Sequence, residues 1–337
     1  MVGEGWEKKK YRFLASCIEL SEALRVGPKF VSHLPILFDA TASGIQHQCA
    51  MNRSDEGVEV NLAPGNVPRD IHQKVCDVVQ DEMLDEIEEC DPNAYSFGYI
   101  FLFDRSVLKQ PVMTRFYNSP LGGTAMQIMN KREQGGWPID FKTAYNLARR
   151  TRDATDRLLP KSLEVNEFLG KCAKALAEQN KPLRWTSPSG VPISVRCYPP
   201  STTTIEIRSS GRPHWHIVAD GYEPVIDKGE AINSASSNFV HSCDAAHLAF
   251  VTNRAVREGI ADLAAVHDCF GCPAAQAVRF REIIREEFVR MYESHDVLAE
   301  LRAAVARDLG TDRDLPELPT RGKLDLRGIL HSEFAFD

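Results

Sequence analysis

Long hydrophobic runs are absent from this 337-residue sequence, in which no stretch reaches the ~18 consecutive apolar residues that a membrane-spanning helix needs. We therefore expect no membrane span. Residues 1–10 are polar and contain no apolar segment ahead of a small-residue cleavage site, which argues against a secretory signal. They also lack the Arg- and Ser-rich, acid-poor composition of an organelle transit peptide. These absences predict a cytoplasmic protein.

Cysteine pairs with the spacing of a disulfide framework or a zinc site are also absent. The nine cysteines are odd in number, and reduced thiols are the simplest account of them. Cys269 and Cys272 have CxxC spacing, but no second pair stands elsewhere to complete a zinc site. Chance and a turn explain this spacing well enough, so we predict no metal or redox role for it.

Positive charge is not in excess, since 40 Lys and Arg residues face 47 Asp and Glu residues, for a net charge of −7. This balance argues against a protein whose whole surface binds nucleic acid, although it leaves room for a local basic channel. Acidic residues crowd into 81–91, which we interpret as a solvated helix face. The contents of 43% apolar and 26% charged residues are those of an ordinary globular protein of one large or two average domains.

The pattern of apolar residues predicts an α+β fold, in which helix-rich segments separate a few strands. Residues up to about 60 read as a helix, a strand and a second helix. Alternating apolar and polar residues on either side of a turn predict a β-hairpin near 202–219. Further helices are expected at 66–90, at 100–118, at 140–180 with an interruption near Pro160, at 244–258 and at 274–293.

Two aspartates follow directly after apolar runs. Asp39 ends the run that begins at Leu34, and Asp268 follows the run that ends at Val266 and His267. This pattern predicts buried strands that each deliver a carboxylate to a turn. Two such carboxylates can hold a pair of hard cations, which suits phosphoryl transfer. A single Asp in this position more often begins a turn or caps a helix, and that alternative stays open for each residue taken alone.

A stripe of four residues in the segment 105–117 suggests a binding surface. Arg105, Lys109, Met113 and Tyr117 recur every four residues, so a helix would place them along one face. The two cations could hold a triphosphate, and the Tyr a sugar and base. The alternative is an ordinary helix with extended cations and a half-buried Tyr. Pro111 predicts a kink or a new turn within the segment.

Six separate blocks of the sequence, taken in order, resemble those of a known family. With them the chain resembles the single-subunit RNA polymerases of bacteriophages and mitochondria, over nearly all of residues 11–337. Any one block would be a weak match, whereas six in order are a strong one. The blocks are 38–47, 105–117, 185–192, 238–247, 266–271 and 322–336.

The resemblance implies a polymerase right-hand fold, with a small antiparallel palm sheet and mainly helical fingers. Residues 1–60 would form the first palm segment and 61–240 the fingers. Within the fingers, the hairpin near 202–219 corresponds to the loop that reads promoter bases in the phage enzymes. Residues 241–337 would form the second palm segment and a C-terminal foot. The N-terminal domain and the thumb of full-length relatives are expected to be absent.

The resemblance also implies how the palm carboxylates act. Asp39 and Asp268 fall at the positions of the two aspartates that bind the catalytic metals, two Mg²⁺ ions, and the carbonyl of Ala40 would be an additional metal ligand. His267 is expected either to orient Asp268 or to line the path of the primer. Two nearby carboxylates repel each other, so the pair favours divalent cations over two bare charges.

The nucleotide-binding residues follow from the same resemblance. Arg105 and Lys109 match residues that hold the incoming triphosphate, and Lys109 could protonate the pyrophosphate leaving group. Tyr117 matches the residue that guards the nucleotide sugar, and His241 the one beside the ribose 2′-hydroxyl. Asn118 stands where the phage enzymes have Gly after this Tyr, and Asn tolerates the left-handed backbone that such a turn needs.

The resemblance therefore predicts template-directed RNA synthesis, with a DNA template, an RNA product and nucleoside triphosphates as partners. A second polypeptide could supply the thumb and the N-terminal region. The cytoplasmic location would then be that of a bacterial host or of a virus-encoded enzyme. Two alternatives stay open: a DNA polymerase or primase that shares the palm, and an inert or partner-dependent fragment that binds nucleic acid.

Overall fold

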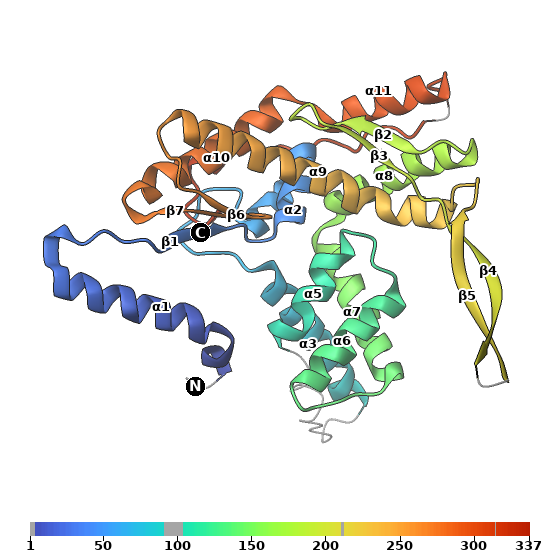
Figure 1. Ribbon diagram of the computed structural model, residues 1–337, viewed down its shortest axis with the longest axis horizontal. Helices are drawn as coiled ribbons and strands as arrows, with labels where there is room; N and C mark the ends of the chain where they lie inside the picture. The colour runs from blue at the N-terminus through green and yellow to red at the C-terminus, as the bar shows by residue number, and fades with distance from the viewer. Residues whose placement is uncertain (1–3, 91–103, 210–211, 314) are drawn as a thin grey trace.

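Helices form most of the molecule, and a few short antiparallel strands lie among them (Figure 1). The computed structural model describes residues 4–90, 104–209, 212–313 and 315–337. The predicted α+β class with a small antiparallel sheet is confirmed. No helix in the described part of the chain is long and apolar enough to cross a membrane.

The sheet that carries the two aspartates has three strands in the order β1-β7-β6. They are β1 (Pro35–Asp39), β6 (Ala264–Val266) and β7 (Cys269–Pro273), and both pairings are antiparallel. The prediction that these strands are buried is wrong for most of their side chains. Only Phe38 of β1 is buried, where its ring packs 6.3 Å from that of Phe280, and β6 is exposed throughout. One face of the sheet thus packs on the core, while apolar side chains on the other remain uncovered.

The helix predicted after the first strand is α2 (Ser43–Asn52), and every residue in it is buried. A 3₁₀ helix, η2 (Asp55–Val60), follows it. Before the strand, α1 (Glu4–Val26) and η1 (Gly27–Lys29) form an arm that extends away from the other helices (Figure 1). The predicted order of helix, strand and helix is therefore confirmed.

Four helices form the lower lobe in Figure 1: α3 (Ile71–Cys90), α5 (Arg105–Arg115), α6 (Leu121–Gln134) and α7 (Phe141–Leu158). The start predicted at residue 66 for α3 is too early, because Asp70 caps the helix by accepting bonds from the N–H groups of His72 and Gln73. Residues 100–103 of the predicted helix 100–118 lie outside the described residues. The helix α6 was not predicted.

The helix α5 runs through Pro111 without interruption, so no new helix begins there, and the kink stays a prediction. Pro111 is buried together with Val107, whose carbonyl loses its helical donor. Packing of this face against α3, α6 and α7 holds the helix in shape. The interruption near Pro160 is confirmed: Leu159 leaves the helical conformation, and α8 (Pro160–Glu178) starts at the proline.

The upper layer consists of α9 (Lys228–Arg257), α10 (Ala277–Ser294) and α11 (Val297–Leu309). The helix α9 begins well before the predicted residue 244, because Asp227 caps it by accepting a bond from the N–H of Glu230. Neither α11 nor the short hairpin of β2 (Leu183–Thr186) and β3 (Pro192–Val195) was predicted. The 3₁₀ helices η3 (Ala274–Gln276) and η4 (Leu326–His331) complete the set.

The hairpin predicted near 202–219 is present and longer than expected. It consists of β4 (Pro200–Ser209) and β5 (Arg212–Tyr222), which pair antiparallel and extend from the body of the molecule (Figure 1). Trp215, Ile217 and Tyr222 of β5 are each more than 60% exposed. A two-stranded hairpin without a packed face is only marginally stable alone.

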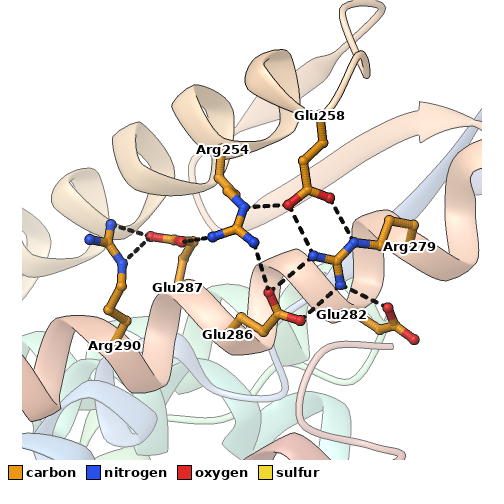
Figure 2. Close-up of polar contacts among 7 residues, drawn as sticks. All are labelled: Arg254, Glu258, Arg279, Glu282, Glu286, Glu287 and Arg290. Carbon is orange, nitrogen blue, oxygen red and sulfur yellow. Dashed lines mark hydrogen bonds and ion pairs between the residues drawn. The ribbon is translucent and has the colours of Figure 1, made fainter.

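A network of ion pairs fastens α9 to α10 (Figure 2). Arg279 donates to Glu258 at 2.7 Å and to Glu282 and Glu286 at 2.8 Å. At the other end, Glu287 lies between Arg254 and Arg290, and its side chain is only 2% exposed. These contacts fix the helix that precedes β6 against the one that follows β7.

Candidate active site

The two predicted metal-binding aspartates lie at the same end of the three-stranded sheet. Asp39 is the last residue of β1 and pairs with Cys269, the first residue of β7. Asp268 directly precedes Cys269, in the two-residue turn from β6 to β7. The pKa of Asp39 is raised, first by partial burial and then by the charge of Asp268. Two residues more than two hundred positions apart in the sequence thus share one electrostatic environment.

The last residue of the chain holds the end of β1 in place. The N–H of Asp39 donates to the carbonyl of Asp337 at 3.0 Å, and the N–H of Asp337 donates back to the carbonyl of Asp39 at 3.1 Å. Ala40 forms a β-bridge with Phe336, whose ring is buried among Phe270 and other aromatic side chains. The chain end therefore positions the backbone around Asp39, and the Asp337 carboxylate lies 3.7 Å from Arg281.

His267 occupies the turn beside Asp268 with a left-handed backbone, at φ 57°. A non-glycine residue in this region is strained, so neighbouring contacts must hold it. Its Nδ1 lies 3.2 Å from Asp268 Oδ1 and 3.2 Å from Asp244 Oδ2. The contact with Asp268 is the one that an orienting role requires, and that role stays a prediction.

Asp244 is the functional candidate that the sequence did not reveal. It lies on α9, is 5% exposed, and accepts a hydrogen bond from Ser43 Oγ at 3.0 Å. Its Oδ1 is also 3.4 Å from His47 Nε2, and His47 Nδ1 lies 2.6 Å from the hydroxyl of Tyr292. Burial opposes its ionisation, but His47, His267 and Ser43 outweigh that effect and lower the pKa of Asp244 to about 2. Its place in the block 238–247 was the only available signal.

Tyr117 and His241 lie together at a pocket of about 170 Å³. Their ring centroids are 4.8 Å apart, and the ring of His241 meets that of His267 edge-on at 5.4 Å. Burial, followed by the charges of Asp244 and Asp268, raises the pKa of Tyr117 to about 12, so the phenol stays protonated. Burial and His267 lower the pKa of His241. The pocket is lined by Ala42, Ser43, Gly44, Ile45, Met113, Tyr117, His241, His267 and Asp268.

The predicted stripe on α5 is present. Arg105, Lys109 and Met113 are exposed, and Tyr117 follows the last turn with its side chain half-buried. Asn118 has the left-handed backbone expected of it, at φ 59°. The positive charge of Lys109 opposes the rise in the pKa of Asp39. Lys109 therefore acts electrostatically on the carboxylate site.

Arg105 is the first residue of α5 and forms an ion pair with Asp70, the capping residue of α3. Burial works against ionisation of Asp70, but its hydrogen bonds with Arg105 and the N–H of Gln73 lower its pKa overall. The pair connects two helices of the lower lobe. A triphosphate that binds Arg105 must therefore compete with Asp70 for the guanidinium.

The oxygen atoms at the sheet end suit a hard divalent cation. Within the described ranges, no group of three or more His, Cys, Asp and Glu side chains is arranged to hold a metal ion. The donor set is instead two carboxylates, with the backbone carbonyl of Ala40 beside Asp39. Such a set leaves positions for phosphate oxygens and water, as Mg²⁺ prefers. The pKa of Asp39 is raised first by burial and then by the charge of Asp268, and a bound cation would offset both effects.

Comparison with known proteins bears on this arrangement. Residues 4–313 match the family model described as DNA-dependent RNA polymerase. The chain belongs to this family. It is 30% identical over 356 residues to the mitochondrial DNA-directed RNA polymerase 1 of Arabidopsis thaliana, a match that covers 100% of this chain and 35% of that relative. It is also 33% identical over 340 residues to the chloroplastic DNA-directed RNA polymerase 3B of Nicotiana tabacum, covering 97% of this chain and 34% of the relative.

The predicted resemblance to single-subunit, phage-type RNA polymerases is thereby confirmed, and the chain matches the C-terminal portion of its relatives. The chain spans about a third of the length of the curated relatives it matches. These relatives are named as mitochondrial and chloroplastic enzymes of plants. The prediction of a cytoplasmic protein, from a bacterial host or encoded by a virus, is therefore wrong. The sequence of residues 1–10 was too weak a basis for it.

Proposed function

We propose that the chain carries the nucleotide-addition site of a DNA-directed RNA polymerase. In this role it transfers nucleotides from nucleoside triphosphates to an RNA 3′-hydroxyl on a DNA template. The observation that carries the proposal is the arrangement of Asp39 and Asp268 at one end of the sheet, beside the pocket that holds Tyr117 and His241. Family membership supports RNA synthesis in general terms.

In the proposed mechanism, Asp39, Asp268 and the carbonyl of Ala40 hold two Mg²⁺ ions. When bound, these would activate the 3′-hydroxyl and neutralise charge in the in-line transition state. Arg105 and Lys109, both exposed, bind the triphosphate from the α5 side, where it must displace Asp70 from Arg105. Lys109, whose charge acts on Asp39, would donate a proton to the pyrophosphate leaving group.

Selection of the sugar would depend on Tyr117 and His241. The phenol stays protonated because burial raises its pKa, so it can donate a hydrogen bond within the pocket. The side chain of His241 is exposed beside it, with its pKa lowered, and a neutral imidazole can accept a bond from a ribose 2′-hydroxyl. A polar pair that is left unsatisfied by deoxyribose discriminates strongly against it.

Primer extension with a labelled RNA on a DNA template tests the proposal. The wild-type chain should incorporate ribonucleotides when Mg²⁺ is present, and Asp39→Asn and Asp268→Asn should each reduce incorporation at least 100-fold, a typical loss for a metal ligand. Asp262→Asn, at an exposed carboxylate just before β6, serves as the matched control and should leave the rate unchanged. Equal rates in all four proteins would contradict the proposal.

A DNA polymerase or primase sharing this palm is the competing enzymatic function. The Tyr117–His241 pair favours ribonucleotides, because its polar groups need the 2′-hydroxyl as a partner. Comparison of ribo- and deoxynucleotide incorporation on one template separates the two. If the chain used deoxynucleotides preferentially, the proposed activity would be DNA synthesis in place of RNA synthesis. Asp39 and Asp268 would keep their proposed role as metal ligands.

We further propose that the β4–β5 hairpin contacts duplex DNA. A two-stranded ribbon fits the major groove, which is about 12 Å wide. The hairpin projects from the body (Figure 1), and Ile205, Trp215 and Ile217 are each at least 38% exposed. Ile217→Ala together with Trp215→Ala should weaken binding to duplex DNA in a mobility-shift assay, while primer extension on a preformed hybrid should continue. Unchanged duplex affinity would count against this contact.

The inert or partner-dependent alternative is supported by the apolar surface of α1. Phe13, Leu20 and Leu24 are each at least 49% exposed along one side of this helix, and Ile36 of β1 is 42% exposed. Relatives are about three times longer, so their remaining length offers a partner for this surface. We propose that a segment or second polypeptide equivalent to that remainder packs on α1 and β1.

Coexpression with the N-terminal two-thirds of a plant relative tests this docking. Leu20→Glu with Leu24→Glu should abolish copurification and make the isolated chain more monodisperse, because a charge replaces each uncovered leucine. The control pair Ser16→Glu with Ser21→Glu lies on the same helix and leaves the leucines in place. Equal copurification of both double variants with the partner would contradict the proposed surface.

A further inference from the structure

The buried carboxylate of Asp244 contacts both segments next to the proposed metal ligands: the start of α2 after Asp39, and the β6–β7 turn that carries Asp268. Asp244 accepts a hydrogen bond from Ser43, the first residue of α2 in the segment that follows Asp39. Its second oxygen lies 3.2 Å from Nδ1 of His267, in the turn that carries Asp268. Asp244 itself comes from neither strand. It lies in the middle of α9, a helix of 30 residues.

The side chains around Asp244 on the side away from the pocket are buried and make polar contacts with one another. There, His47 lies 3.4 Å from Oδ1 of Asp244 and is itself bonded to Tyr292 of α10, at 2.6 Å. His47 and Tyr292 are 2% and 3% exposed. A carboxylate held in this way cannot move without breaking contacts to α2 and α10. It is therefore suited to keep neighbouring groups at fixed positions.

The turn on its other side requires such support. His267 has a left-handed backbone that a non-glycine residue adopts only under constraint, and its imidazole is half-exposed at the pocket. Without a fixed acceptor, the ring could rotate away from Asp268. The direct contact between His267 and Asp268 would then be lost, and the carboxylate would be free to take other rotamers.

We propose that Asp244 is a positioning residue, which sets the distance between Asp39 and Asp268 by holding Ser43 with one oxygen and His267 with the other. This inference rests on the proposed function and assigns a role to a residue that touches neither metal nor substrate. Groups that orient metal ligands in this way commonly contribute 10- to 100-fold to metal affinity or activity.

The alternative is that Asp244 serves only the stability of the core, as many buried charged groups do. Glu287 offers a matched control, because its carboxylate is equally buried, lies on the neighbouring α10 and pairs with Arg254 and Arg290, away from the pocket. Asp244→Asn and Glu287→Gln each remove one buried charge while preserving shape. A merely structural role predicts similar behaviour of the two variants.

Mn²⁺ binding to the folded chain, followed by electron paramagnetic resonance without nucleic acid, gives a readout independent of turnover. Asp244→Asn should weaken Mn²⁺ binding by about 10-fold or more, while Glu287→Gln should bind as the wild type does. In primer extension, Asp244→Asn should lower kcat and raise the Mg²⁺ concentration for half-maximal rate, with little change in the KM for nucleotide.

Wild-type Mn²⁺ affinity in a folded Asp244→Asn protein would overturn the inference, as would an equal loss in Glu287→Gln. If Asp244→Asn does not fold, Ser43→Ala removes one of the two arms and leaves the carboxylate in place, and its Mn²⁺ binding should weaken in the same direction. Mn²⁺ binding by the wild type that Asp268→Asn does not diminish would instead contradict the proposed metal site itself.

Discussion

The ring of Tyr117 lies directly against Gly44 of α2. A methyl group at position 44 would collide with the Tyr117 hydroxyl and would come within 2.8 Å of its Cζ atom. The absence of a side chain at Gly44 therefore defines where the phenol rests, between the start of α2 and the ring of His241. Gly44, which lies in the sequence block 38–47, thus shapes the part of the pocket where Tyr117 and His241 are proposed to contact the sugar.

Gly44→Ala should displace Tyr117 and impair nucleotide use without unfolding the chain. We expect the KM for ribonucleotides to rise several-fold and deoxynucleotide exclusion to weaken, as measured by steady-state primer extension. Gly122→Ala is the control, because a Cβ there meets nothing within 4 Å and the residue lies in α6. Normal kinetics in Gly44→Ala would show that the phenol can move without consequence.

Tyr117→Phe should relax the exclusion of deoxynucleotides while preserving the stacking of the ring on His241. The hydroxyl is the polar partner in this pocket, and its loss removes the penalty for a missing 2′-hydroxyl. The ratio of kcat/KM for ribo- and deoxynucleotides should fall by at least 10-fold. Tyr145→Phe on α7, with a partly exposed ring outside the pocket, should leave the ratio unchanged. Unaltered selectivity in Tyr117→Phe would remove this residue from the proposed gate.

Asp39→Asn should stabilise the metal-free chain and abolish stabilisation by Mg²⁺. In the folded chain the pKa of Asp39 is raised above its ordinary value of 3.8. The ionised carboxylate therefore lowers the unfolding free energy at pH values above the raised pKa, and this loss disappears below pH 3.8. At pH 7 we expect a gain in Tm on the order of 1 °C, small because the carboxylate is largely exposed to solvent. Added Mg²⁺ should raise the Tm of the wild type only. Calorimetry with and without a chelator checks both expectations.

Asp244 should contribute stability with a defined pH dependence. Its folded pKa is lowered from 3.8 to about 2, so the contribution is complete above about pH 4 and is lost as pH falls toward 2. The shift corresponds to about 2 kcal/mol. Urea unfolding of the wild type and Asp244→Asn should therefore show a difference in unfolding free energy that narrows from pH 5 to pH 2. A difference that stays constant over this range would contradict the lowered pKa.

The network between α9 and α10 should respond to substitution according to burial. Glu287→Gln removes the charge between Arg254 and Arg290 at a 2% exposed site, and we expect a loss of about 2 kcal/mol in unfolding free energy. Glu282→Gln removes a 53% exposed partner of Arg279 and should cost less than about 0.5 kcal/mol. Chemical denaturation at low and high salt measures both. Equal losses would mean that burial does not control the strength of these pairs.

Several features could be predicted from the sequence because local patterns carry them. The four-residue recurrence of Arg105, Lys109, Met113 and Tyr117 predicted the exposed stripe of α5, and alternation predicted the β4–β5 hairpin. The continuation of α5 through Pro111 could not be predicted locally, because it depends on packing against neighbouring helices that offsets the loss of one hydrogen bond. The burial of β1 and β6 was also predicted wrongly, because an apolar run does not reveal which face another element covers.

By itself, the sequence determined the family, the α+β class and the two acids that follow apolar runs, since these depend on residue identity and order along the chain. Only the tertiary structure showed that Asp39 and Asp268 meet beside β7, that Asp337 pairs with the backbone of Asp39, and that Asp244 reaches both turns. The role of Asp244 lies in contacts between α9, α2 and the β6–β7 turn. Such long-range contacts leave no periodic signal, because they arise from how separate elements pack in space.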